Sequence, residues 1–130
     1  MQATFNIESL PIRITYAGEA TPWGDRLSDQ WNITISSAAG HYSTNYYTGT
    51  GLRKQGKPVR PTNADVLHSL FMDASASDFN FSDWCDEYGY SDDSLKALNT
   101  YKACLDIARA LRKHFSPEQR AQIQEIIQDM

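Results

Sequence analysis

The chain has 130 residues, of which 41% are hydrophobic and 22% charged, and its formal net charge is −4. This length suits a single domain over residues 1–130 with its own core, and an aromatic content of 12% argues against global disorder. The apolar runs are too short for a membrane span, and the first residues lack the basic start and apolar core of a signal peptide, so we expect a cytoplasmic protein.

Two segments near the start of the chain alternate polar and apolar residues. Residues 4–8 and 11–16 are therefore predicted as strands. The segment 17–26 that follows is rich in turn-forming residues, so we expect an exposed loop, which carries Trp23. This tryptophan has two alternative roles: it folds back over the sheet, or it anchors a contact with a partner.

The clearest strand pattern is the hairpin that comes next. Residues 29–37 and 41–48 are predicted to pair across a short turn. The apolar residues of the first strand share one face: Trp31, Ile33 and Ile35. Because an antiparallel sheet with one apolar face needs a cover, the sequence predicts an α+β fold. An N-terminal antiparallel sheet of three to four strands (residues 1–48) packs against C-terminal helices (residues 62–130).

A basic connector, residues 49–61, joins these two parts. Its cations are Arg53, Lys54, Lys57 and Arg60. Glycine amides beside lysines can cradle phosphates, but the Gly-Lys-Ser/Thr ending of a phosphate loop is missing and no helix follows at once. These four cations are therefore the alternative nucleic-acid contacts of the chain, and a nucleotide site is not expected.

Three short helices are predicted from their caps and apolar spacing. Thr62 caps the first, which runs from residue 63 to about residue 73. The second covers residues 82–88 and ends at Gly89, since glycine suits a left-handed cap. Ser116-Pro-Glu-Gln gives the last helix a capping box. The last helix either folds back on the core or docks onto a second copy of the chain, so a homodimer is one alternative.

A longer helix is predicted between the second and the last of these. Its apolar residues recur at spacings of four and three: Ala97, Tyr101, Cys104, Ala108, Leu111 and Phe115. Ser91 is the predicted cap, and Asp92 and Asp93 are expected in the first turn, where the helix dipole favours carboxylates. Tyr90 and Leu95 have the positions of a hydrophobic staple. We expect the apolar stripe to pack on the sheet.

The modest net charge hides a block of carboxylates. No Lys or Arg lies between Pro61 and Leu95. The acidic residues late in this block stand beside aromatic ones, and together they are the predicted partner-binding residues: Asp83, Asp86, Glu87, Asp92 and Asp93, with Trp84, Tyr88 and Tyr90. Interfaces tend to combine aromatic anchors with oriented charge, so this region is a candidate contact surface. In the alternative interpretation the acids only solvate helix starts and the aromatics belong to the core.

The residue patterns give little support to catalysis, to a cofactor or to a metal. Asp83, Asp86 and Glu87 have helical spacing, but the loop spacing of a calcium site is absent. Cys85 stands among acids that would raise its pKa and keep the thiol protonated. Cys85 and Cys104 are expected as free thiols in a reducing compartment. We therefore expect a protein that is not an enzyme and holds neither cofactor nor metal.

Several stretches after the first forty residues resemble a family of small, mostly uncharacterised proteins of phages and prophages. They are Tyr47-Thr-Gly-Thr-Gly, Pro61-Thr-Asn-Ala-Asp-Val-Leu, Phe81-Ser-Asp-Trp-Cys-Asp-Glu-Tyr-Gly-Tyr-Ser-Asp-Asp-Ser, and Tyr101-Lys-Ala-Cys to Leu111-Arg. The resemblance implies no catalytic residues. It implies a short accessory gene product that inhibits host defences or modulates nucleic-acid enzymes, and the chain looks like an anti-CRISPR or other anti-defence protein.

Two hypotheses of function follow from the charge layout and the resemblance. In the first, a phage-encoded inhibitor binds a bacterial defence complex, with a CRISPR effector as the leading candidate, and its acidic surface mimics DNA. In the second, a phage accessory module binds nucleic acid through the connector cations and the basic end of the long helix. The acidic balance of the chain argues against direct nucleic-acid binding. Both hypotheses place the protein in the cytoplasm of the host cell.

Overall fold

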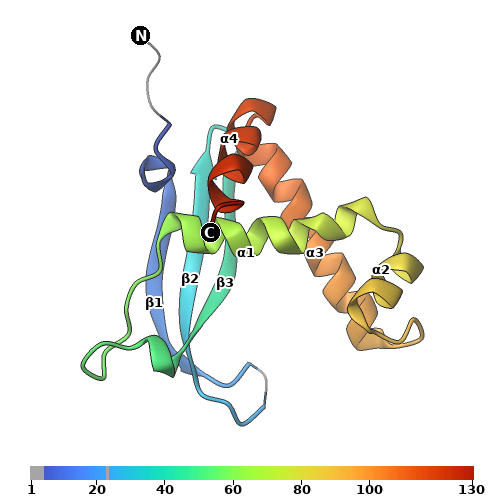
Figure 1. The fold of residues 1–130 in the computed structure, drawn as a ribbon, viewed down its shortest axis with the longest axis horizontal. Coiled ribbons are helices and arrows are strands. Elements are labelled where there is room, and N and C mark those ends of the chain that lie inside the picture. The colour runs from blue at the N-terminus through green and yellow to red at the C-terminus, as the bar shows by residue number, and fades with distance from the viewer. Residues whose placement is uncertain (1–4, 23) are drawn as a thin grey trace. The chain divides into compact units, whose positions relative to one another are not determined.

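The computed structural model describes residues 5–22 and 24–130. Within these described residues, a three-stranded antiparallel sheet comes first and is followed by four α-helices, so the predicted α+β class is confirmed (Figure 1). The chain divides into two compact units, Met1–Val66 and Leu67–Met130, which are described in turn. None of the helices in the described ranges combines the length and the apolar character needed to cross a membrane.

The first unit is built on the sheet, in the order β1 (Ile12–Ala20), β2 (Ser28–Ser37) and β3 (Gly40–Gly49). Both neighbouring pairs are antiparallel, and the predicted hairpin of β2 and β3 is confirmed. The residues of the predicted apolar face are buried, together with two from β1: Ile12, Ile14, Trp31, Ile33 and Ile35. Alternation along the strand thus sets which face of the sheet is apolar.

Two predictions about the start of this unit are wrong. Residues 7 and 8, predicted within a strand, belong to the 3-10 turn Ile7–Ser9, while Thr4 lies outside the described residues. The side chain of Asn6 accepts a hydrogen bond from the Glu8 amide at 3.0 Å, and such a local bond competes with strand pairing. The predicted loop is also shorter, because residues 17–20 continue β1 through a bulge at Gly18 (φ +105°). Trp23 lies outside the described residues.

The basic connector contains two defined turns. After the 3-10 turn Thr50–Leu52, Lys54 and Lys57 exchange backbone hydrogen bonds of 3.0 Å in both directions. Gln55 (φ +52°) and Gly56 (φ +73°) between them have left-handed backbone angles, as a two-residue hairpin turn of this type requires. The two lysines therefore stand at the base of a tight turn.

The helices are α1 (Asn63–Ala74), α2 (Phe81–Tyr88), α3 (Leu95–His114) and α4 (Pro117–Ile127), with a 3-10 turn, Ser75–Asp78, after α1. The predicted cap of α1 is confirmed, because Thr62 Oγ1 accepts from the Asp65 amide at 3.1 Å and the Asp65 carboxylate accepts from the Thr62 amide at 3.0 Å. The capping box at Ser116 is confirmed as well. Helix α2 begins one residue earlier than predicted, after Asn80.

The predicted start of α3 is wrong. The cap is Ser94, whose hydroxyl accepts from the Ala97 amide at 3.2 Å, and no acidic residue lies in the first turn. The hydroxyl of Ser91 instead donates to the Asp93 carboxylate. The predicted staple is absent too, since Leu95 is exposed and Tyr90 stacks on Trp84. The cap at Ser94 starts the helix so that Ala97 is fully buried beside Trp84.

The apolar stripe of α3 is buried at both of its ends and half-buried in between, with Ala97 fully buried at its start. Ala108, Leu111 and Phe115 are buried, while Tyr101 and Cys104 are half-buried. Helix α4 contacts α3 and buries Ile123 and Ile127.

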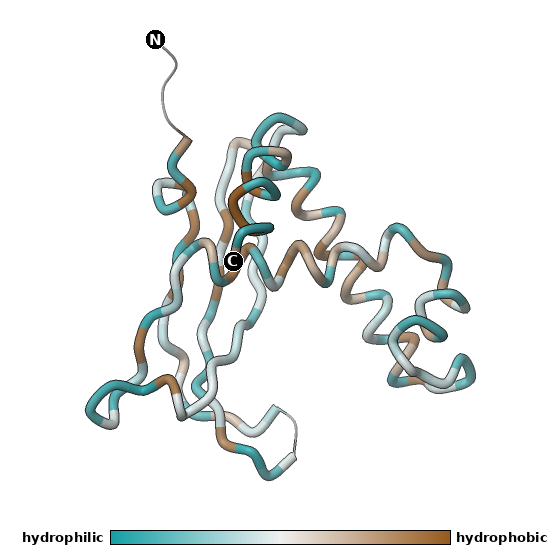
Figure 2. The backbone as a smooth tube through the Cα atoms, in the orientation of Figure 1, coloured by the Kyte–Doolittle hydropathy of each residue, from teal (hydrophilic) through white to brown (hydrophobic). Residues whose placement is uncertain are grey.

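Hydrophilic positions recur along α2 and the turn after it (Figure 2).

We expect the substitution Leu111→Ala to lower the free energy of unfolding by about 2–5 kcal/mol, because truncation of a buried leucine leaves a cavity. The Leu111 residue is 3% exposed. Its exposed neighbour provides the control, and Arg112→Ala should change the free energy by less than about 0.5 kcal/mol. Urea denaturation measures both, and equal midpoints for the two variants would contradict the buried position of Leu111.

Candidate functional site

The predicted partner-binding residues lie on α2 and the turn that follows it. The Asn80 side chain accepts from the Asp83 amide at 2.8 Å and caps the start of the helix. Gly89, with a φ of +75°, ends the helix in the predicted left-handed cap. These caps fix both ends of a short helix that projects two carboxylates, Asp86 and Glu87, into solvent.

An aromatic cluster lies beneath this helix. Trp84 is 4% exposed and stacks on Tyr90, with 4.8 Å between ring centroids and 10° between ring planes. Tyr101 of α3 packs against Trp84 at 5.3 Å and donates its hydroxyl proton to the Phe79 carbonyl at 2.7 Å. Trp84 therefore supports the predicted surface from below and is not itself an exposed contact residue.

The other two predicted aromatic residues reach the surface. Tyr88 is 51% exposed and Tyr90 is 37% exposed. A recess of about 180 Å³ beside them is lined in part by Met72 and Asp73. A second recess of about 300 Å³ shares Met72 and Tyr88 with the first. We name the exposed residues of this region the α2 surface: Asp83, Asp86, Glu87, Tyr88, Tyr90, Asp92 and Asp93.

The carboxylates of the α2 surface lack cationic partners in the described part of the chain. The ion pairs there join Arg53 to Glu19 and Asp29, and Arg109 to Asp106. Helix capping explains few of these acids, because only Asp83 lies in the first turn of a helix. The surface thus combines negative charge without partner cations and two exposed aromatic rings.

Both cysteines are free and have a raised pKa. Burial raises the pKa of Cys85, and the charges of Asp92 and Asp86 raise it further, as predicted from the acidic neighbours. Burial and the Asp73 charge raise the pKa of Cys104 to about 11. Both thiols therefore stay protonated at neutral pH. Within the described ranges, no three His, Cys, Asp or Glu residues are grouped to hold a metal ion.

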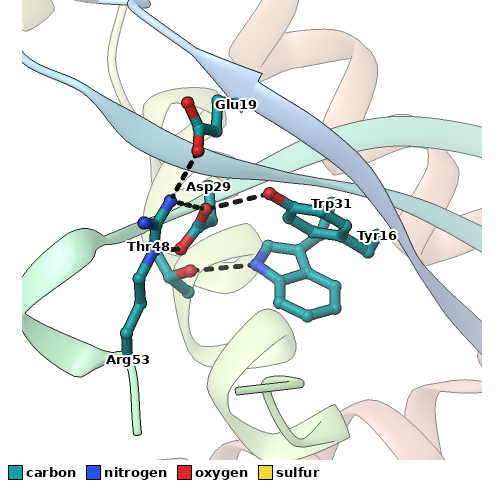
Figure 3. A network of polar contacts seen from close by, with 6 residues as sticks. All are labelled: Tyr16, Glu19, Asp29, Trp31, Thr48 and Arg53. Atoms are coloured by element: carbon teal, nitrogen blue, oxygen red, sulfur yellow. Dashed lines mark hydrogen bonds and ion pairs between the residues drawn. The ribbon is translucent and has the colours of Figure 1, made fainter. Parts of the chain in front are cut away.

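A second polar arrangement, in the first unit, was not predicted. The Asp29 side chain is 1% exposed and accepts from Arg53 Nε at 2.9 Å and Nη2 at 2.6 Å (Figure 3). The Tyr16 hydroxyl donates to the same carboxylate at 3.1 Å, and Glu19 accepts from Arg53 at 3.3 Å. This network joins the start of the connector to β1 and β2.

The strand alternation contains the signal for this network. Asp29 shares its face of β2 with Trp31 and Ile33, so the pattern itself places a carboxylate on the buried side. A buried carboxylate needs hydrogen bonds and a cation. Arg53 supplies both and is not available for nucleic acid, in contrast to the exposed Lys54, Lys57 and Arg60.

The network also sets the ionisation of Asp29. The Arg53 guanidinium holds the pKa of Asp29 below its ordinary value of 3.8, and the Tyr16 hydroxyl acts in the same direction, while burial opposes both. Burial and the bond to Asp29 raise the pKa of Tyr16. The carboxylate therefore stays charged and fully engaged at neutral pH.

Comparison of the chain with protein-family models, with curated proteins and with solved structures finds no match. Roles for the residues of the α2 surface and of the Asp29 network therefore come from their geometry alone. The resemblance to phage proteins stays a prediction.

We expect Arg53→Met to cost about 3–5 kcal/mol of unfolding free energy at neutral pH, because it leaves the buried Asp29 carboxylate without its cation. The lowered pKa of Asp29 means that the ion pair stabilises the protein above pH 3.8 and that this stabilisation is lost as the pH falls through the folded-state pKa. The difference between wild type and variant should therefore shrink in acid.

Chemical denaturation at neutral pH and in acid measures this pH dependence. Arg13→Met removes an exposed arginine of β1 and serves as the control, with an expected change under about 0.5 kcal/mol. The double variant with Asp29→Asn should recover part of the lost stability, because no buried charge remains. An Arg53→Met cost that is equal at the two pH values would contradict the role of the ion pair.

Proposed function

We propose that this protein is a non-enzymatic binding protein that attaches stoichiometrically, through its α2 surface, to a basic surface of a nucleic-acid-handling protein. The observation that carries the proposal is the exposure of Asp86, Glu87, Asp92 and Asp93 without cationic partners in the described chain, beside two exposed tyrosines. Charges that form no ion pair in the described ranges and cap no helix remain available to a partner.

The mechanism of binding follows from the chemistry of DNA-binding grooves. Such grooves hold DNA largely through lysine and arginine contacts to phosphates, so a rigid set of carboxylates competes for the same cations. The helix caps at Asn80 and Gly89 fix the α2 carboxylates in advance, which reduces the entropy lost on binding. Tyr88 and Tyr90 add the aromatic contact area that interfaces favour.

The resemblance noted in the sequence indicates the biological setting. In that setting the protein is phage-encoded and the partner is a bacterial defence complex in the host cytoplasm, with a CRISPR effector as the leading candidate. Occupation of the DNA channel by the α2 surface would then inhibit the complex without chemistry and without a cofactor.

The first test of the proposal is charge reversal on α2. The triple variant Asp83→Lys, Asp86→Lys and Glu87→Lys should weaken partner binding by about tenfold or more, equivalent to about 1.4 kcal/mol. The Asn80 side chain bonds the backbone amide of residue 83, so the substitutions leave this cap in place. The measurement is a pull-down from host lysate, followed by calorimetry with the purified partner.

A matched control reverses three exposed acids on and after α4: Glu118→Lys, Glu125→Lys and Asp129→Lys. Its net charge changes by the same amount, so unspecific attraction affects both variants equally. Loss of binding in both would contradict a specific α2 surface. Phage plating on CRISPR-proficient and CRISPR-deficient hosts tests the setting, and equal plating with and without the protein in both hosts would contradict anti-CRISPR activity.

Nucleic-acid binding through the connector is the second candidate function. It keeps Lys54, Lys57 and Arg60 as exposed cations, but Arg53 is taken up by the buried carboxylate of Asp29. Few cations in an acidic protein give weak phosphate binding that salt screens further.

We therefore expect the connector to bind duplex DNA only as a nonspecific binder does, with a dissociation constant of about micromolar or weaker at physiological salt. Specific DNA-binding proteins have far lower dissociation constants. A gel shift with wild type and with the variant Lys54→Glu, Lys57→Glu measures this affinity. Submicromolar binding that the double variant abolishes would favour this second function over the first.

A further inference from the structure

The two edges of the sheet differ in how they are protected from further strand pairing. In the described part of the chain, β3 pairs along one side only, with β2. Its register with β2 is continuous over ten residues, from Gly40 opposite Ser37 to Gly49 opposite Ser28, without a bulge. It contains no Pro, Asp, Glu, Lys or Arg. An edge strand of this kind is a template for another strand.

The other edge, β1, carries several of the features that block such pairing. Pro11 precedes the strand, and Arg13 and Glu19 place charges on it. A bulge between Tyr16 and Gly18 interrupts its register with β2 and twists the strand locally. A further strand can therefore pair with the sheet at β3, whereas the features of β1 disfavour pairing at the other edge.

We propose that β3 pairs antiparallel with β3 of a second copy of the chain, about a two-fold axis at Thr44. A two-fold axis perpendicular to the sheet keeps each side chain on its own face, so residues of equal parity lie opposite each other. With the axis at Thr44, Thr44 of one chain lies directly opposite Thr44 of the other. The two sheets then join into one continuous sheet.

The side chains of β3 are compatible with this symmetry on both faces. On the half-buried face, Tyr42 lies opposite Tyr46 of the second copy, and the same pair occurs twice. On the exposed face, Ser43 lies opposite Asn45 of the second copy, again twice. Cross-strand aromatic pairs and small polar pairs both stabilise antiparallel sheets. Because the strand carries no Asp, Glu, Lys or Arg, these side chains cause no charge repulsion between two copies of β3.

This occupant fits β3 better than a foreign peptide does. A strand that pairs with itself satisfies the backbone groups of both edges at once and leaves no new edge at the joint. The proposal is independent of the proposed function, because β3 belongs to the first unit of the chain and the α2 surface to the second. The two therefore fail in separate experiments.

Sedimentation equilibrium over a range of concentrations tests the dimer. Wild type should show a mass of twice the 14.7 kDa of one chain. The variant Ser43→Lys, Asn45→Lys places like charges along the joint and should raise the dimer dissociation constant by about tenfold or more. The control variant is Asn32→Lys, Thr34→Lys. These two residues lie on the central strand β2, opposite Asn45 and Ser43, so this variant should keep the dimer.

Oxidative cross-linking tests the register between the two β3 strands. This test remains valid even if the lysine variants fail to fold. Thr44→Cys should form a disulfide-linked dimer, because directly opposite residues in antiparallel strands have Cα atoms about 4.5–5.5 Å apart, within disulfide range. Asn45→Cys is the control, because residue 45 of one copy lies diagonally across from residue 45 of the other, at a distance of about 7–8 Å. Wild type reports the background from its own two cysteines.

Each result either supports or overturns the proposal. A concentration-dependent dimer that β3 lysines weaken and β2 lysines spare, with cross-linking specific to position 44, supports it. A monomeric wild type at all concentrations overturns it, and so does equal cross-linking at positions 44 and 45. Equal dissociation by the β2 and β3 lysine variants would place the dimer interface elsewhere and overturn it as well.

Discussion

The burial of Trp84 is the constraint on which the candidate site depends. Trp84 packs with Cys85, Ala76 and Ala97 in one cluster, so it joins α2 to α3 and to the turn after α1. Once this face of α2 is inside, the helical period places Asp83 and Asp86 on the opposite, solvent-facing side. The direction in which the carboxylates point is thus a consequence of apolar packing beneath them.

The acidic residues of the chain show two opposite uses of the same chemical group. Asp29 is buried, and its charge is tolerated only because Arg53 and Tyr16 saturate it with hydrogen bonds. Asp86 and Asp92 are exposed and without such partners in the described chain, so water solvates both carboxylates. The first arrangement stabilises the fold, while the second leaves charge exposed, as the proposed binding of a partner requires.

The proposed binding surface and the proposed dimer would reinforce each other. A dimer formed through β3 would carry two α2 surfaces, and a partner complex with repeated basic sites could engage both at once. Binding of the second surface is then intramolecular, so the apparent affinity rises without any new contact. This gain requires that both surfaces reach their sites together.

The sequence by itself determined the features that depend on neighbours along the chain. Alternation fixed the β2–β3 hairpin and its buried face, and local hydrogen bonds fixed the caps at Thr62 and Ser116, because each needs only residues a few positions apart. Of two nearby serines that both suit a cap by residue type, the folded chain uses Ser94 for α3, and Ala97 in its first turn packs with Trp84. Tertiary structure decided that Arg53 pairs with a carboxylate distant in the chain, and that Trp84 is buried while its aromatic neighbours reach the surface. Such outcomes depend on long-range packing, which spacing along the chain does not encode.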